Sequence, residues 1–495
     1  MPKAPISLTK ARTSLLALLL AGAVLAAGAP TALASHNQTV FFEPGIVVLE
    51  PHKREHAFAQ MEHLGVHALR IELYWSYVAP ASGAKKRPKF EATNPAAYNW
   101  SLYDWVLNKA KELKWQVLLT VTSPVPKWAS SNHTALGSPI ARDFEEFMTA
   151  VGHHYSSEVS LFAIWNEPND IAFLQPQFTA SGQPASPRVY RALFQAGYAG
   201  LKAGGIAHPK VLMGETAPVG FDSLSRSYIN ETGGVKRGGL LHDVAPLAFM
   251  RGALCLNSHY RKAGGCESLP AYGYSTHAYT QKPGPLWVPP GYDDVTIGVL
   301  NRLESALNKA AAAGAIRAGI PIYLTEFGVQ STPNRYEGVS PAKQAEEDAL
   351  AEYMAWRNPR VAAFSQYLLH DDPTGGPPGS GVHGGTVGFQ TGLEYVNGSP
   401  KPLYFSWPLP LLVYRSGHGY TLWGLVRPAT GATKVTVFVR PRGSKKFRVL
   451  QTASTNSLGY WDFTSSTAGT AWKVRWTSPG GVKYEGPPIG LSSAP

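Results

Sequence analysis

Residues 161–169 read Leu-Phe-Ala-Ile-Trp-Asn-Glu-Pro-Asn, an apolar run that ends in an acid followed by proline. A proline pushes the residue before it out of helical backbone, so a β-strand over Leu161–Trp165 should end here. Residues 320–328 read Ile-Pro-Ile-Tyr-Leu-Thr-Glu-Phe-Gly and repeat the arrangement, with a glycine closing the turn. The two stretches place Glu167 and Glu326 at the tips of two separate strands.

Outward from these stretches, short apolar runs alternate with longer segments of helical periodicity between residues 40 and 370. The candidate strands are Thr39–Val48, Ala68–Leu73, Gln116–Val121, Leu161–Trp165, Val211–Gly214, Gly273–His277, Ile320–Thr325 and Ala362–Leu369. The candidate helices are Ser101–Leu113, Arg142–Tyr155, Arg188–Ala203, Val295–Ala313 and Pro341–Trp356. This α/β alternation predicts repeated βα units, and eight of them favour a closed (β/α)8 TIM barrel. An open doubly wound sheet is disfavoured because no Gly-rich dinucleotide fingerprint follows the first strand.

After Pro408 the sequence changes to short alternating runs separated by turn residues. These runs are Tyr420–Val426, Lys434–Arg440, Phe447–Thr452, Gly459–Phe463 and Ala471–Thr477. They predict a compact all-β sandwich. We therefore expect a barrel domain over residues 35–409 and a smaller C-terminal β-sandwich over residues 410–495. The Gly- and Pro-rich stretch Asp371–Gly392 predicts a long loop at the strand-8 end of the barrel.

The first 34 residues have the features of a removed secretory signal. They contain a basic start, an apolar run over Leu15–Ala29 and the small-residue pattern Ala32-Leu33-Ala34. The alternative, an uncleaved membrane anchor, is disfavoured because the run is shorter than the roughly 20 residues that span a bilayer. Charged or turn residues interrupt every later apolar run, so we expect a secreted protein without a membrane segment once the signal is removed.

Cys255 and Cys266 are the only cysteines in the sequence, and they share a Gly-rich segment. Export to an oxidising compartment favours a disulfide between them, and free buried thiols are the alternative. A zinc site is disfavoured because two cysteines without a matching histidine pair cannot complete a four-coordinate shell. We therefore expect no metal site.

The formal net charge of +12 is concentrated at the C-terminal end of the chain. From residue 410 onward, eleven Lys and Arg residues stand against only Asp462 and Glu485, which gives 11 − 2 = +9. Such charge suits an acidic wall polymer or nucleic acid, but more often it is simply a solvated face. If this domain has a partner, we expect an acidic wall polymer and not nucleic acid.

The two strand-tip acids suit the chemistry of glycosidic bonds. Cleavage with retention uses one protonated and one ionised carboxyl group about 5 to 5.5 Å apart. In a barrel the C-terminal ends of all strands meet at one face, so side chains that are distant in sequence converge there. Glu167 and Glu326 are separated by 326 − 167 = 159 residues, about three βα units, which fits strands 4 and 7.

The segments Ile164-Trp165-Asn166-Glu167-Pro168-Asn169 and Leu324-Thr325-Glu326-Phe327-Gly328 resemble a clan of barrel glycosidases. That clan includes the cellulase-like and β-xylosidase-like families. The resemblance covers most of residues 38–408. It implies Glu167 as general acid/base and Glu326 as nucleophile, with a carbohydrate substrate and no metal or organic cofactor.

The same resemblance implies roles for four further residues. Arg70 is similar to the clan's strand-2 arginine, which holds the nucleophile ionised, and Asn166 is similar to the residue that binds the sugar 2-hydroxyl. On strand 6, His277 and Tyr279 match the clan's pair, and Tyr279 is the expected hydrogen-bond donor to the nucleophile. Each of three residues also has a structural alternative. Arg70 can form an ion pair with Glu72 or another carboxylate, and Asn166 can cap a turn with its amide. His277 can be a packed core residue.

Aromatic residues near the expected site carry a weaker signal. Trp75 and Trp128 follow strands 2 and 3, where their rings can stack on a sugar, although most tryptophans are core residues. Strand 8 lacks the tryptophan that many clan members place beneath the bound sugar. Either Tyr367 or Gln366 replaces it, or the pocket recognises a sugar other than those of plant β-glucans. The remaining strand-end acids, expected to bind hydroxyls or serve structure, are Glu72, Glu215, Asp371 and Asp372.

From these observations we expect a secreted retaining glycoside hydrolase that cleaves O-glycosidic bonds of an oligo- or polysaccharide by double displacement. One alternative is a noncatalytic carbohydrate-binding or cell-wall-attached protein. The other is a transglycosidase that works through the same covalent intermediate. Release of reducing sugar from glycans would distinguish a hydrolase from the noncatalytic protein. Product analysis at high sugar concentration would distinguish a hydrolase from the transglycosidase.

Overall fold

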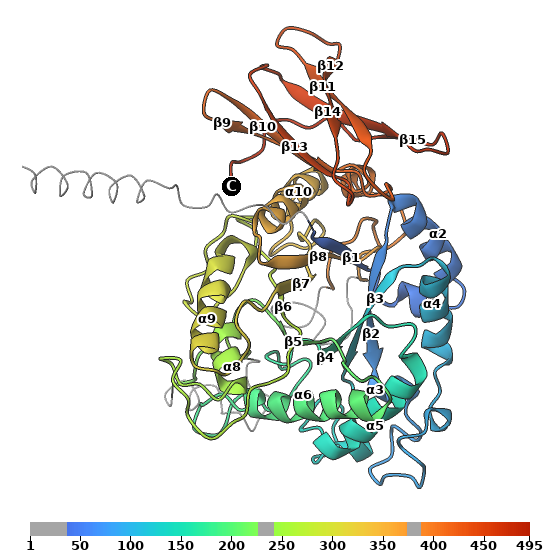
Figure 1. The fold of residues 1–495 in the computed structure, drawn as a ribbon, viewed down its shortest axis with the longest axis vertical. Helices are drawn as coiled ribbons and strands as arrows, with labels where there is room; N and C mark the ends of the chain where they lie inside the picture. The colour runs from blue at the N-terminus through green and yellow to red at the C-terminus, as the bar shows by residue number, and fades with distance from the viewer. Residues whose placement is uncertain (1–36, 226–241, 374–387) are drawn as a thin grey trace, which may run out of the picture.

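The computed structural model describes residues 37–225, 242–373 and 388–495, so the expected signal segment lies outside it. Eight strands close a parallel barrel in which each strand pairs with its neighbours in chain order (Figure 1). They are β1 (Thr39–Glu43), β2 (Ala68–Tyr74), β3 (Gln116–Thr122), β4 (Leu161–Ile164), β5 (Val211–Thr216), β6 (Gly273–His277), β7 (Ile322–Glu326) and β8 (Val361–Tyr367). The predicted TIM barrel is confirmed.

Proline changes two strand boundaries from those predicted. β1 ends at Glu43, five residues early, because Pro44 has no N–H for the ladder, and a 3-10 helix, η1 (Gly45–Leu49), follows. β7 begins at Ile322, immediately after Pro321, for the same reason. The shorter β1 makes Glu43 a strand-tip residue.

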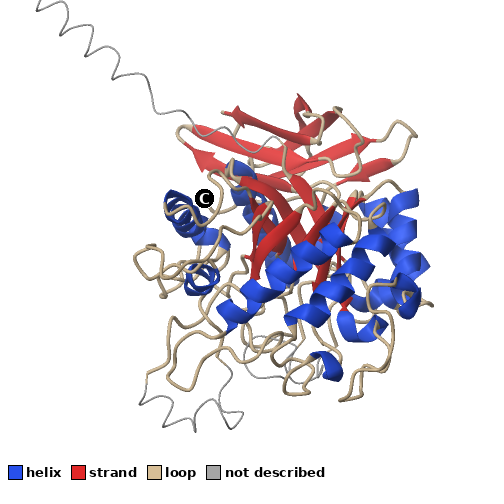
Figure 2. Ribbon diagram, turned by 60° about the horizontal axis from the view of Figure 1, so that its bottom comes forward, coloured by secondary structure: helices blue, strands red, loops and turns tan. Residues whose placement is uncertain are grey.

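Helices surround the barrel on the outside (Figure 2). The α-helices are α2 (Arg54–Leu64), α3 (Trp75–Val78), α4 (Ser101–Glu112), α5 (Ala141–Tyr155), α6 (Ser186–Ala203), α8 (Pro246–Ala253), α9 (Leu300–Ala312), α10 (Pro341–Arg357) and α11 (Pro402–Ser406). Short 3-10 turns are η2 (Pro95–Ala97), η3 (Lys127–Ala129) and η4 (Ile297–Val299). α2 and α8 were not predicted: in α2 polar residues separate the buried positions, and α8 has only eight residues, too few to repeat the helical period clearly.

Apolar side chains fill the barrel interior near the N-terminal ends of the strands. Phe41, Leu118, Leu161 and Leu212 belong to one buried cluster, separate from the larger core between strands and helices. Because side chains alternate along a strand, the next inward residue of β1 after Phe41 is Glu43. The apolar plug thus supports a polar layer at the C-terminal ends of the strands, the end that carries active sites in this fold.

The C-terminal region forms two antiparallel sheets (Figure 2). The inner sheet has the order β13-β10-β9 and the outer sheet the order β12-β11-β14-β15. Their strands are β9 (Leu411–Ser416), β10 (Gly419–Leu425), β11 (Lys434–Arg440), β12 (Arg448–Ser454), β13 (Tyr460–Ser465), β14 (Ala471–Thr477) and β15 (Lys483–Glu485). The predicted β-sandwich is confirmed, and it contains two strands beyond the five predicted, β9 and β15.

Helix α10 joins the barrel to the inner sheet. Tyr353 and Trp356 of α10 share a buried apolar cluster with side chains of β9, β10 and β13. Arg427 forms two hydrogen bonds with Glu352 of α10, 2.9 and 2.6 Å long, and both side chains are almost fully buried. The Arg427 guanidinium also lies 3.5 Å from the ring centre of Trp407. The two parts of the chain are therefore joined by a buried apolar cluster and a buried ion pair.

The structure bears on two further predictions, the disulfide and the membrane segment. Cys255 and Cys266 form a disulfide. Among the described residues, every helix is too short or too polar to cross a lipid bilayer.

Candidate active site

Glu167 and Glu326 meet at the C-terminal end of the barrel. Glu326 is the last residue of β7, and Glu167 follows the end of β4 by three residues. One carboxylate oxygen of each lies within 4.8 Å of the other, and both lie within that distance of a ring nitrogen of His277. This closeness is compatible with the roughly 5 to 5.5 Å between carboxyl groups that attack a sugar directly.

The backbone after β4 is held in an unusual conformation. Trp165 and Glu167 have φ angles of 69° and 38°, in the left-handed region that residues with a side chain seldom adopt. The Trp165 ring nitrogen donates to the Phe173 carbonyl at 3.0 Å, and the Asn166 N–H donates to the Thr122 hydroxyl at 3.0 Å. These anchors hold the strained turn, which is the kind of cost found at functional sites.

Arg70 occupies the centre of the polar layer. Its buried guanidinium donates to Glu326 at 2.7 Å and to Glu215 at 2.6 Å, and it also contacts Glu43. A further bond reaches the amide oxygen of Asn166 at 2.7 Å. Arg70 thus directly contacts the expected nucleophile, whereas the alternative partner Glu72 instead accepts a hydrogen bond from Tyr74.

Asn166 is oriented by this contact. Because Arg70 occupies the amide oxygen, the amide NH2 group is the part of Asn166 that can donate to a ligand. The alternative role of Asn166 as a turn cap does not describe this arrangement, since its side chain bonds a strand-2 residue.

His277 and Tyr279 connect the two acids. His277 Nδ1 lies 2.8 Å from Glu167 and 3.4 Å from Glu326, and its Nε2 lies 3.6 Å from Glu215. The Tyr279 hydroxyl donates to the second oxygen of Glu326 at 2.9 Å. His277 is fully buried but surrounded by carboxylates, so it is not merely a packed core residue.

The surroundings give these groups different proton affinities. Burial raises the pKa of Glu167 to about 7, with a further contribution from the charge of Glu326. Burial disfavours the charged form of His277, but Glu326 and Glu167 outweigh it and raise its pKa to about 10. Burial also opposes ionisation of Glu215, yet Arg70 and His277 hold its pKa well below the ordinary value. At neutral pH, His277 carries a positive charge and Glu167 is able to hold a proton.

Solved structures share this architecture at low sequence identity. A family 39 glycoside hydrolase from the gut symbiont Bacteroides cellulosilyticus WH2 superposes with a TM-score of 0.51 and 15% identity, over 87% of this chain and 80% of that one. A glucosidase from Croceicoccus marinus superposes with a TM-score of 0.51 and 11% identity, over 90% of this chain and 96% of that one. The chain has the fold of barrel glycoside hydrolases. No protein-family model matches the sequence, and no curated protein matches it significantly.

Two further acids lie in the polar layer around Arg70. Glu215 is fully buried between Arg70 and His277, which agrees with the structural role that was one of its two expected alternatives. Glu43 was not among the predicted site residues, yet it contacts Arg70 at the tip of β1. Its signal was present, because Glu43-Pro44 repeats the strand-end pattern of Glu167-Pro168.

The structure contradicts the sugar-stacking expectation for Trp75 and Trp128. Trp75 is fully buried, and its ring stacks on Phe147 with centres 5.2 Å apart. Trp128 is 4% exposed and packs edge-on against Trp75 at 6.1 Å, while its ring nitrogen donates to the Pro80 carbonyl. Both rings belong to a core that supports the loops after β2 and β3. The aromatic-rich sequence there reflects packing and not ligand contact.

Strand 8 offered two replacements for the missing tryptophan, and the structure distinguishes them. Tyr367 lies beside the site, with its ring centre 6.2 Å from that of Tyr279. Gln366 is buried and donates to the carbonyls of Tyr367 and Thr391, so its amide is engaged in backbone contacts. Tyr367 is therefore the strand-8 side chain that contacts Tyr279.

The acids after β8 anchor loops. Asp371 pairs with the buried Lys401 ammonium at 2.5 Å, and that ammonium also donates to the Ser331 hydroxyl at 3.0 Å. Asp372 accepts from the N–H of Phe389 at 3.0 Å. These contacts tie together the segments that follow β7 and β8, as the structural interpretation of the two acids predicted. Part of the predicted loop, residues 374–387, lies outside the described residues.

Two groups among the described residues bring enough ligand atoms together to hold a metal ion. One is Glu167, His277 and Glu326, and the other is Glu43, Glu72 and Glu326. Arg70 contacts two acids of the second group, and the raised pKa of His277 makes it a proton donor in the first. Protein cations therefore already supply positive charge where a metal ion would sit.

Proposed function

We propose that this protein is a retaining glycoside hydrolase with Glu167 as general acid/base and Glu326 as nucleophile. The observation that carries the proposal is the approach of their carboxylate oxygens to within 4.8 Å at the ends of β4 and β7. Their environments support different tasks: a pKa of about 7 suits Glu167 to proton transfer, whereas Arg70 and Tyr279 supply Glu326 with a charged and a neutral donor.

In the first step, the Glu167 carboxylic acid gives its proton to the glycosidic oxygen while a Glu326 oxygen attacks the anomeric carbon. The bond between that carbon and the leaving oxygen breaks, and an ester links the sugar to Glu326. In the second step, the Glu167 carboxylate takes a proton from water, and the water oxygen attacks the same carbon. The ester bond breaks, Glu326 is released as a carboxylate, and the sugar leaves with its original configuration.

The neighbouring residues assist this cycle. Arg70 and Tyr279 each donate a hydrogen bond to one oxygen of Glu326, and these two contacts orient the carboxylate for attack. His277 balances the charge around the pair and limits how far the pKa of Glu167 rises. The amide NH2 of Asn166 is available to the sugar 2-hydroxyl, a contact that strengthens as the transition state forms.

The proposed substrate is an oligo- or polysaccharide outside the cell. The signal-like residues 1–34 and the Cys255–Cys266 disulfide support export to an oxidising compartment. The glucosidase with the same fold acts on a glucoside by its name, so aryl glucosides belong in the first substrate panel.

The test begins with a panel of aryl glycosides and polysaccharides, scored for released reducing sugar. Replacing Glu326 by Gln should reduce kcat by at least about a thousandfold, because the attacking oxygen is lost. Exogenous azide should restore turnover to Glu326→Ala and give a glycosyl azide of inverted configuration. Wild-type product should keep the substrate's anomeric configuration when followed by NMR. Binding of glycans without sugar release, or turnover by Glu326→Gln, would remove the proposal.

A further inference from the structure

The C-terminal domain turns one sheet face away from the barrel. The inner sheet packs on α10 with one face, through Leu412, Trp423 and Tyr460. Its other face meets the outer sheet, in a core that includes Val413, Leu422, Val437, Trp472 and Val474. The inward side chains of β11 and β14 pack in this core between the two sheets. The side chains at the alternate positions of both strands therefore point outward. This outward face is the side of the domain opposite α10.

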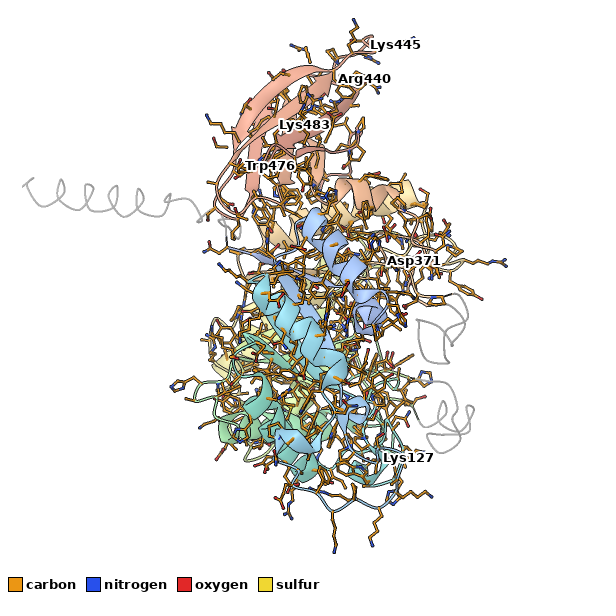
Figure 3. The ribbon with its side chains drawn as sticks, turned by 90° about the vertical axis from the view of Figure 1, so that its right-hand side faces the viewer. Lys127, Asp371, Arg440, Lys445, Trp476 and Lys483 are labelled. Carbon is orange, nitrogen blue, oxygen red and sulfur yellow. A yellow bond between two sulfur atoms is a disulfide. The ribbon has the colours of Figure 1, made fainter. Side chains whose placement is uncertain are left out.

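Five outward residues of β11, β14 and β15 are basic, and they share this face with Phe438 and Glu485. We call them the basic sheet face: Lys434, Phe438, Arg440, Lys473, Arg475, Lys483 and Glu485. The strand register places Phe438 beside Lys473, and Arg475 beside Glu485. Five cations and one anion give this face a net charge of 5 − 1 = +4. Figure 3 places Arg440 near the end of the domain that lies farthest from the barrel, and Lys483 closer to the barrel.

Three of these five cations lie over aromatic rings. The Lys473 ammonium lies 5.0 Å from the ring centre of Phe447 and 5.7 Å from that of Phe438. The guanidinium of Arg475 lies 5.1 Å from the Phe438 ring, and that of Arg440 lies 5.7 Å from the Phe447 ring. Such contacts restrain side chains that would otherwise be freely mobile. The face is thus a partly preorganised array of positive charge, which lowers the entropy cost of binding.

Glu485 limits the charge of the array. It accepts a hydrogen bond from Lys473 at 2.6 Å and from the Arg475 Nε at 2.7 Å. A single acid therefore engages two of the five cations, and an incoming anion competes with it. The other three cations of this face can also contact a ligand: Lys434, Arg440 and Lys483.

We propose that the basic sheet face binds a linear anionic polysaccharide through its carboxylate or sulfate groups. Positive charge spread over a sheet complements a chain with an acidic group on successive sugars. Single-stranded nucleic acid is less suited, because its binding sites offer open aromatic rings for base stacking, and here cations lie over Phe438 and Phe447. The preference for a glycan over other polyanions also rests on the proposed function of the barrel. The face would hold the enzyme on an acidic glycan while the barrel cleaves a bond elsewhere in the same material.

The test measures binding of the full chain to polygalacturonate by biolayer interferometry. The protein carries Glu326→Gln, so that binding is scored without hydrolysis and a failure of the catalytic proposal leaves this assay unaffected. The double variant Lys473→Gln/Arg475→Gln should weaken binding about tenfold, since two contacts are lost while most of each side-chain stem remains. Glu485→Gln should tighten binding about threefold, because the competing anion is removed. Raising the salt concentration should weaken all of these complexes.

The matched control is Arg188→Gln/Lys202→Gln, which removes one arginine and one lysine from exposed positions on α6. It should bind as the parent does. Thermal unfolding of every variant checks that the domain remains folded. The proposal is overturned if neutral galactan binds as tightly as polygalacturonate, if the α6 control loses as much affinity as the sheet variant, if Glu485→Gln weakens binding, or if double-stranded DNA binds more tightly than the glycan.

Discussion

His277 Nδ1 lies 2.8 Å from Oε1 of Glu167, so a fully buried histidine contacts the residue proposed as general acid/base. The same nitrogen lies 3.4 Å from Glu326. Burial raises the pKa of Glu167 and His277 lowers it, so the proton affinity of Glu167 is coupled to the charge of the histidine.

Replacing His277 by Asn should move the alkaline limb of the pH dependence of kcat/KM to higher pH. In the wild type, that limb should lie near the Glu167 pKa of about 7. His277 favours the ionised form of Glu167, so without it the carboxyl group keeps its proton to higher pH. The measurement is the pH–rate profile for an aryl glycoside. The exposed His208 gives a control, His208→Asn, with an unchanged limb, and an acid shift in His277→Asn would contradict the assignment.

Replacing Tyr279 by Phe should lower kcat/KM by about 10- to 100-fold. The hydroxyl donates to Glu326 at 2.9 Å, and a hydrogen bond to a charged group contributes about 1.5 to 3 kcal/mol. Steady-state kinetics gives the loss, and thermal unfolding separates it from a folding defect. Tyr77→Phe is the control, because Tyr77 is 52% exposed. Equal rates for Tyr279→Phe and wild type would show that this hydrogen bond plays no part in catalysis.

The site should discriminate against sugars that carry a carboxylate. Its described acids are Glu43, Glu72, Glu167, Glu215 and Glu326, and the cations among them are Arg70 and His277. Burial raises the pKa of Glu43, Glu72 and Glu167, so the site already disfavours negative charge. A uronic acid would add another carboxylate there, and like charges in close contact cost several kcal/mol. For the aryl glycoside that is turned over, kcat/KM should exceed that of its uronic acid counterpart by at least about 100-fold. Faster turnover of the uronide would refute this electrostatic account.

The junction of barrel and sandwich should be sensitive to loss of one ion-pair partner. Arg427→Met leaves Glu352 buried without its two hydrogen bonds and should reduce the free energy of unfolding by about 3 to 5 kcal/mol. Adding Glu352→Leu removes the unpaired charge and should recover much of the loss. Urea unfolding followed by tryptophan fluorescence measures both variants. If Arg427→Met were as stable as the wild type, water would have to reach the Glu352 carboxylate.

Much of the fold could be predicted because local patterns are tied to local physics. Gly273–His277, Lys434–Arg440 and Ala471–Thr477 were predicted with the bounds that the structure has. The first strand was predicted too long because the apolar residues after Pro44 pack in a 3-10 helix. Strand β15 was missed because three residues are too few to show a period of two.

The candidate site was predictable in part for the same reason. Strand-end acids before proline or glycine identified Glu167 and Glu326, and the resemblance to barrel glycosidases added Arg70, Asn166 and Tyr279. Glu43 was not predicted because its importance depends on Arg70, 27 residues away, turning its guanidinium towards β1. Trp75 was wrongly predicted to contact sugar because burial against Phe147 is a tertiary fact that no local pattern contains.

The sequence by itself determined that eight βα units alternate before an all-β region, and that Glu167 and Glu326 follow the apolar runs of two of those units. These are consequences of periodicity and proline chemistry over a few residues. The tertiary structure alone decided which acids share a cation, which carboxyl group is desolvated enough to hold a proton, and which tryptophans are core residues. Those properties depend on distances across the barrel, because charge interactions and burial act through space and not along the chain.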